Sequence, residues 1–214
     1  MSNDYPDYIV VEGPIGVGKT TLAKQLADTF DTDLMLELPS ENPFLARFYQ
    51  DPKNAALPTQ LYFLFQRAKQ MESLMQADMF RPVQVSDYLL QKDRLFAEIN
   101  LDKDEFSLYK QVYNQLTIDI PVPDLVIYLQ APVDTLMHRI NKRGIDYEQY
   151  INDEYLKKIS DAYIDFFYHY SDSPLLIVNT EEFNLETKPN DYQLLLEHIR
   201  RLKSGRHYFN PQSL

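Results

Sequence analysis

The residues near the N-terminus carry the clearest chemical signal in this sequence. Residues 13–20 read Gly-Pro-Ile-Gly-Val-Gly-Lys-Thr and match the pattern G-x-x-x-x-G-K-[S/T]. A short β-branched run at residues 8–11 precedes them, and apolar residues at helical spacing follow, which is the context that this motif requires. Three of the five glycines of the chain lie in this segment. The pattern therefore predicts a loop that binds phosphate, placed between a strand and a helix.

Each residue type in this loop has its own chemical role. Glycines let backbone N–H groups turn toward phosphate oxygens, and the start of the following helix adds partial positive charge. Lys19 can reach the β and γ phosphates of ATP, and the hydroxyl of Thr20 can bind Mg²⁺. We therefore expect ATP and Mg²⁺ as cofactors, with these residues around the nucleotide: Gly13, Pro14, Ile15, Gly16, Val17, Gly18, Lys19, Thr20 and Thr21.

Short apolar strands alternate with helical segments along the chain. Strands are predicted at residues 8–11, 34–38, 82–87, 124–129 and 175–178. The main helices are predicted at about residues 42–50, 58–78, 151–170 and 192–202. Apolar strands separated by helices indicate an α/β fold, with a parallel five-stranded sheet flanked by helices, in one domain spanning residues 1–214. Functional residues should then follow the carboxyl ends of the strands.

The second of these helices illustrates how its faces are assigned from spacing. Pro58 is expected to be its first residue, because proline is favoured at the first helical position. Leu61, Phe65, Ala68 and Met75 then lie mainly on one side.

The composition limits the class of protein. The chain of 214 residues has 21 Lys plus Arg against 32 Asp plus Glu, so its net charge is −11. A strongly acidic protein is poorly suited to coat nucleic acid. No cysteine is present, which excludes disulfides and thiolate metal sites. No apolar run approaches the roughly 20 residues that span a bilayer. We expect a cytoplasmic protein without nucleic-acid or membrane partners.

A phosphate-binding loop alone leaves GTPases, motor ATPases and small-molecule kinases open. GTPases usually carry an Asn-Lys-x-Asp motif, which this sequence lacks. Motor ATPases usually belong to larger or oligomeric assemblies. The size and sequence therefore favour a small-molecule kinase.

The chain resembles the deoxynucleoside kinase family, and most of all its bacterial deoxyadenosine and deoxyguanosine kinase branch. The resemblance rests on the P-loop, on Glu37 with residues 40–45, on the helical segment 61–67, on Ser86-Asp87 with Asp93-Arg94, and on residues 139–149. It implies a P-loop kinase fold with an arginine-containing lid at about residues 139–150, and a homodimer. It also implies transfer of the γ-phosphate of ATP to the 5′-hydroxyl of a deoxynucleoside, with purine deoxynucleosides favoured.

The same resemblance implies the catalytic residues. Phosphorylating a hydroxyl requires a carboxylate near the nucleophile and cations around the transferred group. Glu37, at the end of the second predicted strand, would accept the hydroxyl proton, and Lys19, Arg139 and Arg143 would stabilise the phosphates. The two arginines are four residues apart on a helix end and can face the same way. Asp87 would hold Mg²⁺ together with Thr20.

The resemblance also implies a set of substrate contacts. Gln66 would read the base, because an amide both donates and accepts, and Tyr49 and Glu148 would hold the sugar 3′-hydroxyl. Phe44, Phe63 and Phe96 would supply stacking or core surface. The predicted substrate residues are Glu37, Tyr49, Gln66, Asp87, Asp93, Arg94 and Glu148.

Two departures from the family keep other functions open. Tyr88 and Ile145 stand where the family commonly has arginines, and a non-catalytic nucleotide-binding domain would account for their loss. A thymidylate-kinase-type nucleoside monophosphate kinase is a second alternative, since it has a similar P-loop and lid. The glutamates at positions 37 and 148 would repel the phosphate of such an acceptor.

Overall fold

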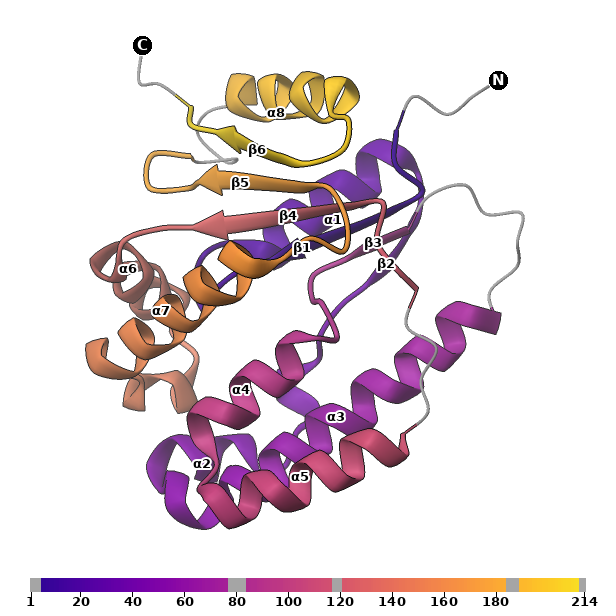
Figure 1. The fold of residues 1–214 in the computed structure, drawn as a ribbon. Coiled ribbons are helices and arrows are strands. Elements are labelled where there is room, and N and C mark those ends of the chain that lie inside the picture. The colour runs from indigo at the N-terminus through magenta and orange to yellow at the C-terminus, as the bar shows by residue number, and fades with distance from the viewer. Residues whose placement is uncertain (1–4, 77–83, 117–120, 184–188, 212–214) are drawn as a thin grey trace.

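A six-stranded parallel sheet is the centre of the molecule (Figure 1). The computed structural model describes residues 5–76, 84–116, 121–183 and 189–211. The strand order is β2-β3-β1-β4-β5-β6, and every neighbouring pair is parallel. The strands are β1 (Tyr8–Glu12), β2 (Asp33–Met35), β3 (Gln84–Ser86), β4 (Leu125–Gln130), β5 (Leu175–Asn179) and β6 (Arg206–Phe209).

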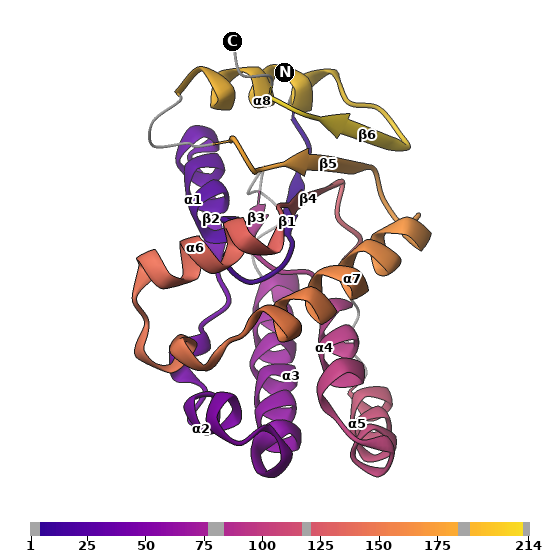
Figure 2. The same cartoon turned by 90° about the vertical axis from the view of Figure 1, so that its left-hand side faces the viewer.

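Helices cover both faces of the sheet and extend beyond one end of it. The α-helices are α1 (Lys19–Phe30), α2 (Leu45–Gln50), α3 (Pro52–Gln76), α4 (Lys92–Asn100), α5 (Lys103–Gln115), α6 (Val133–Arg143), α7 (Asp153–His169) and α8 (Pro189–Arg201). Two 3₁₀ segments, η1 (Pro39–Glu41) and η2 (Asp146–Tyr150), join them. Helices α2, α3, α4 and α5 gather at the end of the molecule opposite β6 and α8 (Figure 2). No helix of the described ranges is long and apolar enough to cross a membrane.

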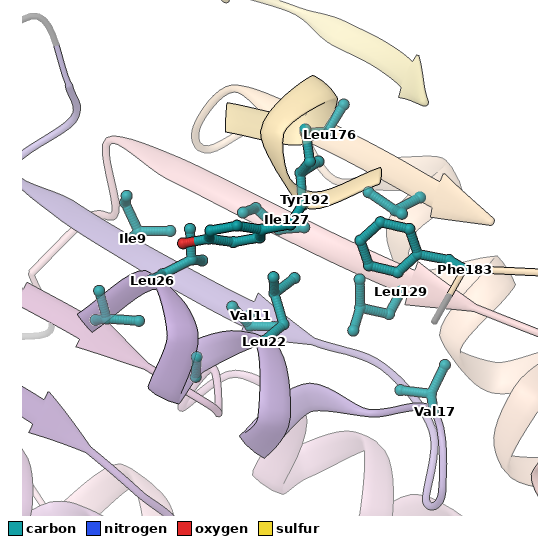
Figure 3. Packing of buried hydrophobic residues seen from close by; sticks show 14 of the residues in the cluster. Ile9, Val11, Val17, Leu22, Leu26, Ile127, Leu129, Leu176, Phe183 and Tyr192 are labelled. Atoms are coloured by element: carbon teal, nitrogen blue, oxygen red, sulfur yellow. The ribbon is translucent and has the colours of Figure 1, made fainter. Parts of the chain in front are cut away.

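Side chains that alternate along the strands form two separate cores. Ile9 and Val11 of β1 pack with α1 and α8, whereas Val10 between them packs with α7. This follows from the two-residue period of a strand, and it explains why the strands are apolar on both faces. Figure 3 shows Leu22 and Leu26 of α1 against the strands, with Tyr192 and Phe183 above them.

The parallel α/β sheet is confirmed, but the prediction of five strands is wrong because β6 adds a sixth. This strand has an alternating pattern of exposed and half-buried residues at the sheet edge, and it contains Arg206 and His207 rather than an apolar run. The second strand is shorter than predicted and ends at Met35, so Glu37 lies beyond it. The first part of the third predicted strand, residues 82–83, lies outside the described residues.

Two details of the helix assignment are also corrected. Helix α3 begins at Pro52, where the missing N–H is no loss, and Pro58 lies inside it. The apolar residues grouped by spacing do not share one environment, since Phe65 is 51% exposed whereas Ala68 is buried. The buried side of the helix also carries Phe63, Leu64 and Arg67. The helix predicted at residues 42–50 starts later, at Leu45, after Asn42 accepts the backbone N–H of Phe44.

The packing of β6 makes a testable prediction. Phe209 is half-buried and its ring meets that of Phe183 edge-on, whereas the adjacent Tyr208 is 67% exposed. We expect Phe209→Ala to lower the free energy of unfolding by about 2 kcal/mol, because it removes a packed ring. Tyr208→Ala is the matched control and should change it by less than about 0.5 kcal/mol. Urea denaturation measures both, and equal losses would contradict the packing of this strand.

Candidate active site

The P-loop leads from β1 into α1 and has the backbone shape that its glycines permit. Gly13 and Gly16 have φ values of 148° and 82°. A Cβ on Gly13 would lie 2.4 Å from the carbonyl oxygen of Leu129, so a larger residue cannot fit. The Lys19 ammonium donates to the carbonyl oxygens of Gly13 and Pro14, at 2.7 and 3.1 Å. The lysine is thus held over the loop, where phosphates would bind.

Asp87 connects this loop to the segment after β2. One carboxylate oxygen accepts the Thr20 hydroxyl at 2.6 Å, and the other accepts the backbone N–H of Glu37 at 2.7 Å. The strand order explains this position, because β3 lies between β2 and β1 and its carboxyl end therefore falls between the two segments. These hydrogen bonds bring Thr20, Asp87 and Glu37 together.

Glu37 lies among cations at this edge of the sheet. Its carboxylate forms an ion pair with Arg67, whose Nε donates to it at 3.2 Å, and the Lys92 ammonium lies 3.4 Å away. Burial alone would raise the pKa of Glu37, but the charges of Lys92 and Arg67 outweigh it and hold the pKa well below the usual range of a carboxyl. The group is therefore ionised at neutral pH.

The charges around Glu37 continue in both directions. Arg67 also pairs with Asp93, which accepts the hydroxyl of Tyr109, and Lys92 lies 3.7 Å from Glu12. The charged side chains therefore alternate in sign along a row of ion pairs. We call this row the buried charge chain; in spatial order it consists of Glu12, Lys92, Glu37, Arg67 and Asp93. All five residues except Glu37 are less than 5% exposed. Such burial requires pairing, because an isolated charge in the interior is strongly disfavoured.

Glu12 has further partners that fix its position. Its carboxylate accepts the backbone N–H groups of Gly13 and Leu89 at 2.9 and 2.7 Å, and the Tyr163 hydroxyl at 2.9 Å. These contacts tie β1 to the loop after β3 and to α7. The charge chain therefore starts from a rigid point beside the P-loop.

Two cavities meet at the P-loop. The inner cavity lies between the sheet and helices α3 and α4, and its lining includes Glu37, Gln60, Phe63, Arg67, Lys92 and Phe96. The outer cavity lies on the other side of the loop and includes Thr21, Arg139, Lys142, Thr180 and Phe183. Four residues line both cavities: Gly16, Lys19, Thr20 and Arg143. Two molecules bound in these cavities would meet at the Lys19 ammonium.

The lid arginines occupy different positions. Arg143 makes a bidentate pair with Glu148, with nitrogen-to-oxygen distances of 3.0 and 2.6 Å. Arg139 donates to the carbonyl oxygen of Val17 at 3.2 Å and to the hydroxyl of Thr180 at 3.1 Å. Both side chains line the outer cavity, as their four-residue spacing predicts.

The structure brings some predicted substrate residues together and leaves others out. Tyr49, Glu148, Phe63 and Phe96 line the inner cavity. Three residues line neither cavity: Gln66, Asp93 and Arg94. Gln66 donates to Glu41 at 3.0 Å instead, Asp93 is fully buried in the charge chain, and Arg94 is exposed. Phe44 is likewise absent from both linings.

Sequence reasoning missed two residues of α3 that line the inner cavity, Gln60 and Arg67. They share one face of the helix with Phe63, because the three residues are spaced three and four apart. Gln60 is 3% exposed, and its Oε1 accepts no hydrogen bond from the described residues. Lys92 was missed as well, because nothing in its sequence context marks it as buried. The residue spacing would have indicated Gln60 if Arg67 had been assigned to the buried face of α3, because both residues lie on that face.

The structure shows what surrounds Tyr88, the residue that stands where an arginine was expected. Tyr88 is fully buried outside the inner cavity, and its hydroxyl donates to Gln70 at 2.8 Å. Two cations that line the cavity lie near the ring of Tyr88, Arg67 and Lys92, each 5.9 Å from the ring centroid. The positive charge on this side of the site therefore comes from helices α3 and α4.

Comparison with known proteins agrees with this geometry. A family model described as deoxynucleoside kinase matches residues 9–203. The chain is 34% identical over 203 residues to a deoxyguanosine kinase of Bacillus subtilis, covering 91% of this chain and 97% of that one. It is 30% identical over 205 residues to a deoxyadenosine kinase of Lactobacillus acidophilus, covering 89% and 94%. A solved structure of M. mycoides deoxyadenosine kinase, with dCMP and dCDP bound, superposes with a TM-score of 0.77 at 26% identity, covering 89% and 99%.

The charges around Glu37 make its contribution to stability depend on pH. Because its pKa is lower in the folded protein than in the unfolded chain, its stabilising effect is present above about pH 4.3 and is lost as the pH falls below it. We expect Glu37→Gln to lower the free energy of unfolding by about 2 kcal/mol at pH 7, and by progressively less below pH about 4. Denaturant unfolding at several pH values measures this difference.

The matched control is Glu41→Gln, an exposed carboxylate on the same segment. Its free energy of unfolding should differ from that of the wild type by a small and nearly constant amount over the same pH range. If the loss of unfolding free energy caused by Glu37→Gln became larger at acidic pH, the ion pairing of Glu37 would be contradicted.

Proposed function

This chain belongs to the deoxynucleoside kinase family, and on that premise we propose that it transfers the γ-phosphate of ATP to the 5′-hydroxyl of a purine deoxynucleoside. One observation carries the proposal: the cavity that contains Glu37 meets the P-loop cavity at Lys19 and Thr20. The deoxyguanosine and deoxyadenosine kinases that the chain resembles support the preference for purines. The family match favours neither a monophosphate kinase nor a non-catalytic domain.

The donor nucleotide binds in the outer cavity. The P-loop amides hold the phosphates at the start of α1, and the Lys19 ammonium exchanges its two carbonyl partners for phosphate oxygens. Burial, followed by the nearby charge of Lys92, lowers the pKa of Lys19 to about 8 in the free protein. A bound phosphate raises that pKa again and keeps the lysine charged. Arg139 and Arg143 lie at the outer edge of this site, where they stabilise charge on the transferred group.

Oxygen donors at the start of α1 fit a magnesium ion. Thr20 and Asp87 bring a hydroxyl and a carboxylate oxygen to within 2.6 Å of each other, and no three acidic or histidine side chains of the described ranges form a cluster able to hold a metal. Mg²⁺ suits a site with few protein ligands, because it takes the rest of its shell from phosphates and water. When bound, it would neutralise charge on the β and γ phosphates.

The deoxynucleoside occupies the inner cavity with its 5′-hydroxyl toward the P-loop. Glu37 is ionised and accepts the proton of that hydroxyl as the new bond to phosphorus forms. Tyr49 and Glu148 bind the 3′-hydroxyl. Burial raises the pKa of Tyr49 well above its usual value, so its hydroxyl remains a donor, and Arg143 holds Glu148 in place. Holding the sugar at this end aligns the 5′-oxygen with the γ-phosphate.

The base contact moves from Gln66 to Gln60 in this proposal. The amide oxygens of Gln60 and Gln66 are both buried with no partner among the described residues, but of the two only Gln60 lines the inner cavity, together with Phe63 and Phe96. A buried unpaired acceptor is unfavourable in the free protein. An amino or ring N–H group of a purine would satisfy it.

A homodimer and a cytoplasmic location remain part of the proposal. Ile164 and Tyr168 are 56% and 70% exposed on α7, which supports an apolar contact with a second subunit. The absence of cysteine suits a reducing compartment. Neither nucleic acid nor membrane is expected as a partner of this acidic chain.

The first test is phosphorylation of the four deoxynucleosides and of thymidine monophosphate in parallel, with ATP and Mg²⁺. We expect deoxyguanosine and deoxyadenosine to react fastest and the monophosphate not to react. Glu37→Gln should lower kcat by about 10²–10⁴, because it removes the proton acceptor. Glu41→Gln, the exposed control, should retain the wild-type rate. A protein that phosphorylated only the monophosphate would refute the proposal.

The base contact is tested by two variants of the same helix. Gln60→Leu should lower kcat/KM for the best purine by about 100-fold, because it removes one buried hydrogen-bond partner. Gln66→Leu changes the same residue type at a position outside both cavities, and should change kcat/KM by less than about 3-fold. The reverse ranking would return the base contact to Gln66.

A further inference from the structure

Lys92 occupies a position that is unfavourable for a lysine in two ways. It is 2% exposed, although lysine is among the residues least often buried. It is also the first residue of α4, where the partial positive charge of the helix end repels a cation. Residues that break such rules without a local gain concentrate at functional sites.

The carboxylates around Lys92 do not satisfy all the hydrogen-bond donors of its ammonium. Glu12 already accepts three hydrogen bonds, from two backbone N–H groups and the Tyr163 hydroxyl, and its oxygen is 3.7 Å from the ammonium. Glu37 already pairs with Arg67, and its contact with Lys92 is long, at 3.4 Å. An ammonium carries three donors. These long contacts leave Lys92 able to bind another oxygen.

Lys92 and Lys19 line the same inner cavity, together with Glu37 and Asp87. Two like charges repel when they share a poorly solvated space, and an anion between them removes the repulsion. In the proposed function, the anion that reaches this position is the phosphoryl group, which passes from the outer cavity to the inner one.

We propose that Lys92 is a catalytic residue, and that its ammonium binds the γ-phosphoryl group from the acceptor side while Lys19 binds it from the donor side. This assignment rests on the proposed function. In the reaction, a bond forms between the 5′-oxygen and the γ-phosphorus as the bond to the β–γ bridging oxygen breaks. The hydroxyl proton passes to Glu37, and ADP leaves with the bridging oxygen. Lys92 exchanges its long contact with Glu37 for an oxygen of the moving group.

The test uses a complex that imitates the transferred group. Wild-type protein and Lys92→Gln are titrated with ADP in magnesium buffer with deoxyguanosine, with and without aluminium fluoride. In the wild type, aluminium fluoride should tighten ADP binding, because it is an analogue of the phosphoryl group. In Lys92→Gln, ADP alone should bind as in the wild type, and the tightening by fluoride should fall by about 100-fold, with a similar loss in kcat.

Two comparisons separate this role from a structural one. Lys103→Gln changes the corresponding first residue of α5, which is exposed, and should keep the wild-type tightening. Glu12→Gln/Lys92→Gln, measured against Glu12→Gln alone, removes both partners of a buried pair and so leaves no unmatched charge if Lys92→Gln fails to fold. The double variant should lose the same fluoride-dependent tightening.

The outcomes distinguish the two claims. If the wild type phosphorylates deoxynucleosides and a folded Lys92 variant keeps the full tightening by fluoride, the role of Lys92 is overturned while the proposed function stands. If the wild type itself phosphorylates none of the deoxynucleosides, the proposed function fails. If Lys92 only positions Glu37, the Lys92→Gln variant should have a lower kcat but should keep the tightening of ADP binding by aluminium fluoride. That result also overturns the proposal.

Discussion

The alternation of sign in the buried charge chain is the constraint on which this site depends. Glu12, Lys92, Glu37, Arg67 and Asp93 come from β1, α4, the segment after β2, and α3. Each lies between partners of opposite sign or accepts additional N–H or O–H groups. A charge without a partner would be strongly disfavoured in this interior. The helices α3 and α4 are therefore positioned against the sheet by electrostatics as well as by apolar packing.

The sheet order determines which residues can meet at the reacting centre. Because β3 separates β2 from β1, Asp87 lies between the P-loop helix and Glu37 and bonds to both. One carboxylate thus sets the distance between the P-loop helix and Glu37, the proposed proton acceptor. Its two oxygens are used by partners from two different segments. A change in the length of the chain after either strand would separate the donor side from the acceptor side.

The features predictable from the sequence are those with local causes. The P-loop, its strand and its helix follow from adjacent residues, and α7 follows from regular apolar spacing that starts after the capping residue Asn152. The buried face of α3 was not predictable in this way, because Arg67 looks like a surface residue until Glu37 and Asp93 are placed beside it. Lys92 and strand β6 depend on tertiary contacts in the same manner. The base contact at Gln66 was an expectation from the family resemblance, and this residue lies outside both cavities.

The division of the site into two cavities with a small common wall has a consequence for protein engineering. Gln60, Phe63 and Phe96 line the inner cavity alone, whereas Lys19 and Arg143 line both. Under the proposed function, substitutions among the first group reshape the space for a nucleobase and leave the triphosphate side intact. Substitutions in the second group alter both sides together. Libraries aimed at nucleoside analogues should therefore vary the walls on α3 and α4 and keep the common wall constant.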